Sequence, residues 1–162
     1  MSIQHIIDIM KELKKNHDQI LELSKQKTEY VKKGEMKQLQ TLLLKERKVL
    51  RIVEQQEQKR MEAVDAWLHN QDMGTDKTTV TNMLNFVENE QDKQTLKHVS
   101  LQLAETIVRL KQQEKLNHDL IAQSMQFVQL SMNLLQPSIQ NMNYGKKDDT
   151  GSIKRSVFDS KA

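Results

Sequence analysis

Several residue types are absent or scarce in this chain of 162 residues, and each scarcity excludes a class of protein. There is no cysteine, which excludes a disulfide scaffold and thiolate metal sites and fits a reducing compartment. Proline occurs once, glycine four times, and the aromatic residues are one Trp, two Tyr and three Phe. A β-sheet protein needs more turn-forming and aromatic residues than this. Long α-helices are therefore the expected structure.

Charge of one sign and long apolar runs are also missing. The net charge is only +3, and the two signs are interspersed along the helical segments rather than gathered in one block. This pattern argues against a nucleic-acid-binding protein. The amino-terminal residues 1–15 mix isoleucine with polar and charged residues, and no segment is apolar over a membrane-spanning length. We therefore expect a cytoplasmic protein without membrane insertion.

Motifs for catalysis or cofactor binding are absent as well. The sequence has no glycine-rich phosphate loop, no nucleophile elbow and no repeated Glu-x-x-His pair. The five histidines form no pair spaced four residues apart on a helix, as a metal site would favour; they are His5, His17, His69, His98 and His118. We expect no enzymatic activity, no cofactor and no metal.

Apolar residues recur every three or four positions in three long segments, which predicts amphipathic helices. The first runs from Ile3 to Lys33 and the second from Glu35 to Leu68. Between them, Gly34 either caps the first helix in a left-handed conformation or is a tolerated interior glycine. The third segment runs from Asp92 to Gln136, where Pro137 is expected to stop it.

The remaining segments complete the predicted architecture. Residues 69–76 read as a polar loop, after which Thr78 or Thr79 caps a short helix. Residues 138–162 lose the helical periodicity and predict a flexible tail. The expected fold is all-α: an elongated antiparallel bundle of three long helices and one short helix over residues 1–136, followed by a flexible tail over residues 137–162.

Some apolar residues are candidates for binding a partner instead of filling a core. Met125 and Met132 lie on the last long segment, where flexible methionines would serve either as core filler or as an adaptable binding surface. Trp67 is interpreted as a packing residue near a helix end. Tyr144 and Phe158 are apolar residues in a polar stretch, which would fold on a partner or dock on its own domain.

The chain resembles the FlgN-type chaperones of flagellar type III export. The resemblance covers nearly the whole chain and is carried by KKGEMKQLQTLLLKE after the first segment, by LNHDLIAQSMQFVQLSMNLL, and by NYG and VFDSKA behind it. The run from Leu116 to Leu135, followed by Tyr144 and Gly145, is its most specific part.

This resemblance implies a cytoplasmic chaperone that holds the two hook–filament junction proteins and delivers them to the export apparatus. In this family the cargo site lies in the carboxy-terminal helical region. Carried onto this sequence, it implies that the cargo is bound by Asn117, Leu120, Ile121, Ser124, Phe127 and Val128.

The main alternative is a structural coiled-coil adaptor that assembles with copies of itself. Strict heptads would favour this function, but polar residues such as His17, Ser24 and Asn117 interrupt the apolar stripes. A chaperone for protein cargo is therefore the preferred hypothesis.

Overall fold

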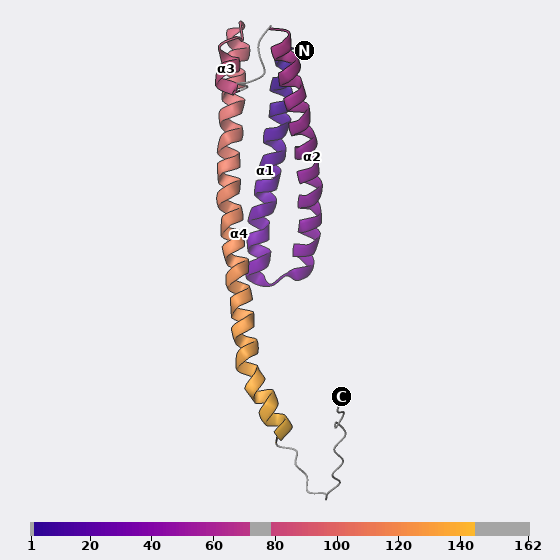
Figure 1. Ribbon diagram of the computed structural model, residues 1–162, viewed down its shortest axis with the longest axis vertical. Helices are drawn as coiled ribbons and strands as arrows, with labels where there is room; N and C mark the ends of the chain where they lie inside the picture. Colours follow the sequence, from indigo (N-terminus) through magenta and orange to yellow (C-terminus); the bar gives the residue numbers. More distant parts are fainter. Residues whose placement is uncertain (1, 72–78, 145–162) are drawn as a thin grey trace, which may run out of the picture. The chain divides into compact units, whose positions relative to one another are not determined.

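The structure is a computed structural model that describes residues 2–71 and 79–144, with only the backbone described for residues 137–144. Its helices are α1 (Ile3–Lys33), α2 (Met36–His69), α3 (Val80–Leu84) and α4 (Glu90–Tyr144). The described part of the chain contains no β-strand. The predicted all-α fold, with three long helices and one short helix, is confirmed (Figure 1).

Contacts within the chain define two units, Met1–Ala122 and Gln123–Ala162. The boundary lies inside α4, so the first unit contains α1, α2, α3 and the first part of α4. The division of the chain into a bundle over residues 1–136 and a flexible tail over residues 137–162 stays a prediction, because residues 145–162 lie outside the described part.

The end of α4 differs from the prediction. We expected Pro137 to stop the last helix, but α4 continues to Tyr144. Proline lacks an N–H and its ring crowds the carbonyl four residues earlier, which together cost about 3 kcal/mol in a helix interior. That cost weakens a helix locally, but it does not prevent the following residues from adopting helical dihedral angles. The expectation that Pro137 ends the helix was wrong.

The turn between α1 and α2 depends on Gly34. This residue has φ 69° and ψ 23°, a left-handed conformation that a side chain would disfavour. Its N–H donates to the carbonyl of Val31 at 3.3 Å, and the N–H of Glu35 donates to the carbonyl of Tyr30 at 3.0 Å. These two bonds form a Schellman motif that satisfies the last carbonyls of α1. Of the two roles considered for Gly34, the structure shows the helix cap.

Side-chain caps explain where α3 and α4 begin. The Thr79 hydroxyl accepts a hydrogen bond from the N–H of Asn82 at 3.3 Å, so Thr79 and not Thr78 caps α3. The Asn89 side chain accepts from the N–H groups of Gln91 and Asp92 at 2.9 and 3.1 Å. With this cap, α4 begins at Glu90. The sequence-based prediction did not recognise the cap and placed the start at Asp92.

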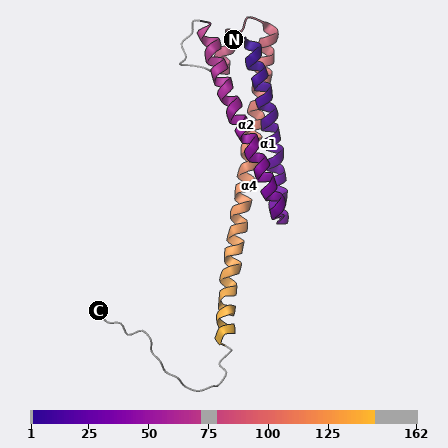
Figure 2. The same cartoon turned by 90° about the vertical axis from the view of Figure 1, so that its right-hand side faces the viewer.

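Within the first unit, α1 lies between its two neighbours. Asn16 of α1 donates to Gln56 of α2 at 2.8 Å, and Lys27 of α1 pairs with Glu46 at 2.7 Å, so α1 and α2 run antiparallel. Thr106 of α4 donates to Asp18 of α1 at 2.9 Å, and contacts nearer the end of α1 involve later residues of α4. Helix α4 therefore runs parallel to α1, and both views show the long helices side by side (Figure 1, Figure 2).

The apolar core forms two clusters. The larger lies near the amino-terminal end of α1 and joins all four helices, through Ile6, Ile7, Met10, Ala63, Val64, Trp67, Leu68, Met83, Val87, Leu96 and Val99. The smaller consists of Ile20, Leu23, Leu42 and Val49, with Leu110 packed against it. Trp67 is buried, in agreement with its interpretation as a packing residue.

Candidate protein-binding surface

A layer of polar side chains joins α1 to α4 near the end of α1. Asn117 of α4 is 2% exposed, and its amide donates to the carbonyl and the hydroxyl of Ser24 at 2.8 and 3.0 Å. The Thr28 hydroxyl donates to the amide oxygen of Asn117 and accepts from Gln113 at 2.6 Å. Asn117, one of the residues implied by the family resemblance, thus lies inside the bundle.

Next to this layer, a cluster of charged side chains links three helices. The Lys27 ammonium of α1 contacts Glu46 of α2 at 2.7 Å and Glu114 of α4 at 3.2 Å. Glu114 also accepts a hydrogen bond from the Ser24 hydroxyl at 2.6 Å. Lys27 and Glu46 are both buried, so each depends on the other for its charge to be tolerated. These contacts fix the position of α4 beside α1.

The register of these contacts shows where α1 ends along α4. Thr28 meets Asn117, which lies 89 positions later in the chain. Applying the same separation to Lys33, the last residue of α1, places the end of α1 beside about residue 122 of α4. The large apolar residues of α4 from Ile121 to Leu135 are exposed.

Most of the predicted binding residues lie on α4 and are exposed. Leu120 is half-buried, whereas Ile121, Ser124, Met125, Phe127, Val128 and Met132 are exposed. Phe127 is the most exposed large apolar residue among them, at 71%. The structure therefore brings these residues together on one helix, with Asn117 separated from them by its burial. Tyr144 is the last residue of α4, but its side chain and all of Phe158 lie outside the described residues.

The exposed apolar residues after Leu120 form two stripes on different sides of the helix, which together we call the α4 surface. One stripe is Ile121, Met125, Val128, Met132 and Leu135, spaced alternately by four and three residues, and the other is Phe127, Leu130 and Leu134. At 100° per residue the two stripes are centred about 145° apart around the helix and run along about 21 Å of it, with Ser124 and Ser131 in the gap between them. The remaining side carries Gln126, Gln129, Asn133 and Gln136. Apolar residues therefore occupy more than half of the circumference of this part of α4, and one polar side remains.

The α4 surface is also uncharged. Between Asp119 and Lys146 the sequence contains no Asp, Glu, Lys, Arg or His, although 29% of the whole chain is Asp, Glu, Lys or Arg. A surface of this kind attracts partners by apolar burial and not by long-range electrostatics. The sequence-based prediction missed this run and also Leu130, although both are visible in the residue order.

Titratable side chains do not gather into a metal site in the described residues, which contain no group of three or more His, Asp or Glu that could hold an ion. One ion pair shifts titration: Arg60 donates to Glu57 at 2.6 and 2.9 Å, which lowers the pKa of Glu57 and raises the pKa of Arg60. Among the described helices, none is long and apolar enough to cross a membrane.

The amino-acid sequence was also compared with known proteins. Residues 1–151 match the family described as FlgN protein. The chain is also similar to the uncharacterized protein YvyG of Bacillus subtilis (strain 168), with 31% identity over 165 residues and full coverage of both chains. No solved structure matches the chain significantly.

Proposed function

Because the chain belongs to the FlgN family, a family of flagellar export chaperones, we propose that it binds the hook–filament junction proteins in the cytoplasm and delivers them to the type III export apparatus. The observation that carries this proposal is the α4 surface, where two apolar stripes are exposed on one helix. Large exposed apolar patches are typical of sites that bind other proteins.

The shape of the surface favours a helical cargo segment. An amphipathic helix recognises its partner through apolar residues spaced three and four apart, which is the spacing of Ile121, Met125, Val128 and Met132. Met125 and Met132 are flexible, so the same surface can adapt to two different cargoes. Covering this surface would also keep the apolar segment of the cargo from aggregating before export.

The energetics allow the cargo to be released. Burying a large apolar side chain contributes about 1.5–3 kcal/mol, but association also loses translational and rotational freedom. A net free energy of about 8 kcal/mol corresponds to micromolar affinity. A component of the export apparatus that competes for the same surface can displace cargo held at that affinity.

The competing function is a coiled-coil adaptor that assembles permanently with its own copies. The polar interruptions of the stripes bear on this alternative: Ser24, Thr28 and Asn117 pair with one another within one chain. The polar side chains that interrupt the heptad pattern therefore find their hydrogen-bond partners within one chain and need no second copy. This favours the chaperone over the self-assembling adaptor.

The test is calorimetric titration of a hook–filament junction protein into the purified chain and into matched variants. Val128 and Val108 lie on the same helix and are 55% and 54% exposed, but only Val128 belongs to the α4 surface. Phe127 and Phe86 form a second pair of exposed residues of one type. We expect Phe127→Ala to weaken binding about tenfold or more and Val128→Ala to weaken it measurably, with Val108→Ala and Phe86→Ala near the wild-type affinity.

Thermal unfolding of the same variants serves as the control for stability. All four residues are exposed, so each substitution should change the free energy of unfolding by at most about 0.5 kcal/mol. Binding should also change little with salt, because the surface carries no charge. Wild-type affinity for both Phe127→Ala and Val128→Ala would contradict this placement of the cargo site.

A further inference from the structure

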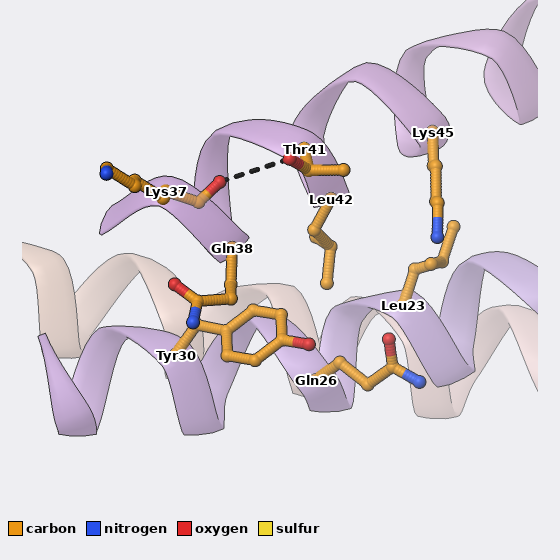
Figure 3. Close-up of a pocket in the computed structure, with 8 residues that line it drawn as sticks. All are labelled: Leu23, Gln26, Tyr30, Lys37, Gln38, Thr41, Leu42 and Lys45. Carbon is orange, nitrogen blue, oxygen red and sulfur yellow. Dashed lines mark hydrogen bonds between the residues drawn. The ribbon is translucent and has the colours of Figure 1, made fainter. Parts of the chain in front are cut away.

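A notch between α1 and α2, close to the turn that joins them, contains no residue of the α4 surface. It has a volume of about 250 Å³ and its floor includes Leu23 and Tyr30 of α1 and Leu42 of α2. Two lysines of α2, Lys37 and Lys45, belong to its lining (Figure 3). In this view Lys45 extends from α2 toward Leu23, while Lys37 points outward at the other end. The notch thus has an apolar floor between two cations.

The side of α2 that borders the notch is strongly basic. Lys37, Lys45 and Lys48 lie within about 80° of one another around the helix and span about 16 Å along it. From Met36 to Val53 the only acidic residue is Glu46, which is buried and paired with Lys27. None of the three lysines forms an ion pair with any residue that the structure describes. Their charge is therefore available to a partner.

The contrast with α1 shows that this is not the general pattern of the chain. On α1, Lys11, Lys14 and Lys25 each have an acidic neighbour three or four residues away at 2.6–3.8 Å. Each acidic neighbour neutralises the charge of its lysine on the helix surface. The basic side of α2 lacks them, although α2 begins only three residues after α1 ends.

We propose that this basic notch binds an acidic amphipathic helix of a second partner protein, at a surface separate from the α4 surface. An apolar side chain of that helix fills the notch over Leu23 and Leu42. Carboxylates spaced about 12 Å apart, as are positions 37 and 45 on α2, meet the two lysines on either side. Lys48 extends the same basic row by one further turn.

Both parts of the notch are needed for such recognition. An exposed ion pair contributes only about 0.2–1 kcal/mol, so the lysines alone would select for acidic partners without holding them. The apolar floor adds a place where one side chain of the partner is removed from water. The lysines then determine which sign of charge the partner carries and accelerate its approach.

The arrangement favours a protein over a membrane or a nucleic acid. A helix that lies on a membrane needs one continuous apolar side, but that side of α2 is already buried against α1 through Leu42 and Val49. The exposed apolar residues Met36, Leu43 and Leu50 share another side of α2, about 160° away from the side of Lys37 and Lys45, so a membrane that took up those residues would not contact the two lysines. Single-stranded nucleic acids are held by aromatic stacking platforms, and this notch offers only the half-buried Tyr30.

The experiment measures binding of a fluorescent synthetic helix of about 20 residues, with leucines every three or four positions flanked by glutamates, to the full-length chain. The substitutions Lys37→Glu and Lys45→Glu together should weaken binding at least about tenfold. The control is Arg47→Glu with Arg51→Glu, which changes the net charge equally but lies about 100° away around α2, and it should weaken binding no more than about threefold. Thr41→Trp, which fills the notch without changing its charge, should also weaken binding about tenfold.

Further probes distinguish the notch from the α4 surface and from a general effect of charge. A peptide with lysine in place of glutamate should not bind, and binding of the acidic peptide should fall as salt increases. Phe127→Ala with Val128→Ala should leave it unchanged, because those residues belong to the α4 surface. If the lysine pair and the arginine pair lost the same affinity on replacement by glutamate, the effect would depend on net charge alone, and the proposal would be overturned. Tighter binding to vesicles with about 30% phosphatidylserine, or to single-stranded RNA, would overturn the choice of partner.

Discussion

Asn117 of α4 donates its amide to the backbone carbonyl of Ser24 of α1 at 2.8 Å, in the interior of the bundle. This bond joins two helices whose residues lie 93 positions apart in the chain. The partners of Asn117 all come from α1, so its polarity is satisfied by folding and not by an external molecule. The free energy of unfolding and the affinity for cargo should therefore respond differently to its replacement.

Replacing Asn117 by alanine should lower the free energy of unfolding by about 1–3 kcal/mol, because Ser24 and Thr28 lose buried hydrogen-bond partners. Denaturant titration measures this change. His118→Ala, at the exposed neighbouring position, should change it by no more than about 0.5 kcal/mol. If Asn117→Ala instead weakens cargo binding while stability is unchanged, Asn117 contacts cargo directly.

Replacing Lys27 by methionine should cost about 3–5 kcal/mol of stability, because it leaves the buried carboxylate of Glu46 without its partner at 2.7 Å. Adding Glu46→Leu should recover a large part of that loss, since two apolar residues replace the pair. Chemical unfolding of the single and double variants measures the difference. If Lys27→Met with Glu46→Leu is less stable than Lys27→Met alone, the unpaired charge of Glu46 is not the cause of the loss.

Two leucines of α4 provide a test of the core. Leu96 is fully buried and Leu101 is 57% exposed. Leu96→Ala should lower the free energy of unfolding by about 2–5 kcal/mol because it removes apolar contacts and leaves a cavity. Leu101→Ala should change it by about 0.5 kcal/mol or less. Unfolding followed by the fluorescence of Trp67, which lies in the same cluster as Leu96, measures this difference. Equal losses of stability for the two variants would contradict the placement of Leu96 in the core.

The Glu57–Arg60 pair predicts a small dependence of stability on pH. The hydrogen bond from Arg60 lowers the pKa of Glu57 in the folded state. Its stabilising contribution is therefore present above the pKa of an unfolded glutamate, about 4.3, and is lost as the pH falls through the lower folded value. The difference in unfolding free energy between wild type and Glu57→Gln should shrink from pH 7 to about pH 3.

The control for this measurement is Glu54→Gln, three residues earlier on the same helix, which removes a carboxylate that does not pair with Arg60. The Glu57 side chain is 46% exposed, so solvent and salt screen the pair and the effect should diminish in high salt. A difference that grows toward low pH would have the wrong sign for this pair.

The sequence by itself determined the secondary structure of most of the chain. Apolar residues spaced three and four apart placed the first helix at Ile3–Lys33, as the structure has it, whereas the role of Gly34 as its cap was one of two possibilities until the structure showed its left-handed conformation. The boundaries that were misplaced depended on finer effects. The Asn89 cap moved the start of α4 to Glu90, and the local cost of Pro137 was too small to end the helix before Tyr144.

Only the tertiary structure decided which residues on the stripes are buried. Asn117 and Met125 lie on the same helix and were both candidates for binding, yet one is 2% exposed and the other 69%. The periodicity that identifies an apolar stripe repeats along a helix regardless of what covers it. Burial depends on how far a neighbouring helix extends. Asn117 is buried because Ser24 and Thr28 of α1 pack against it and hydrogen-bond to it, whereas Met125 belongs to the second unit and takes part in none of those contacts.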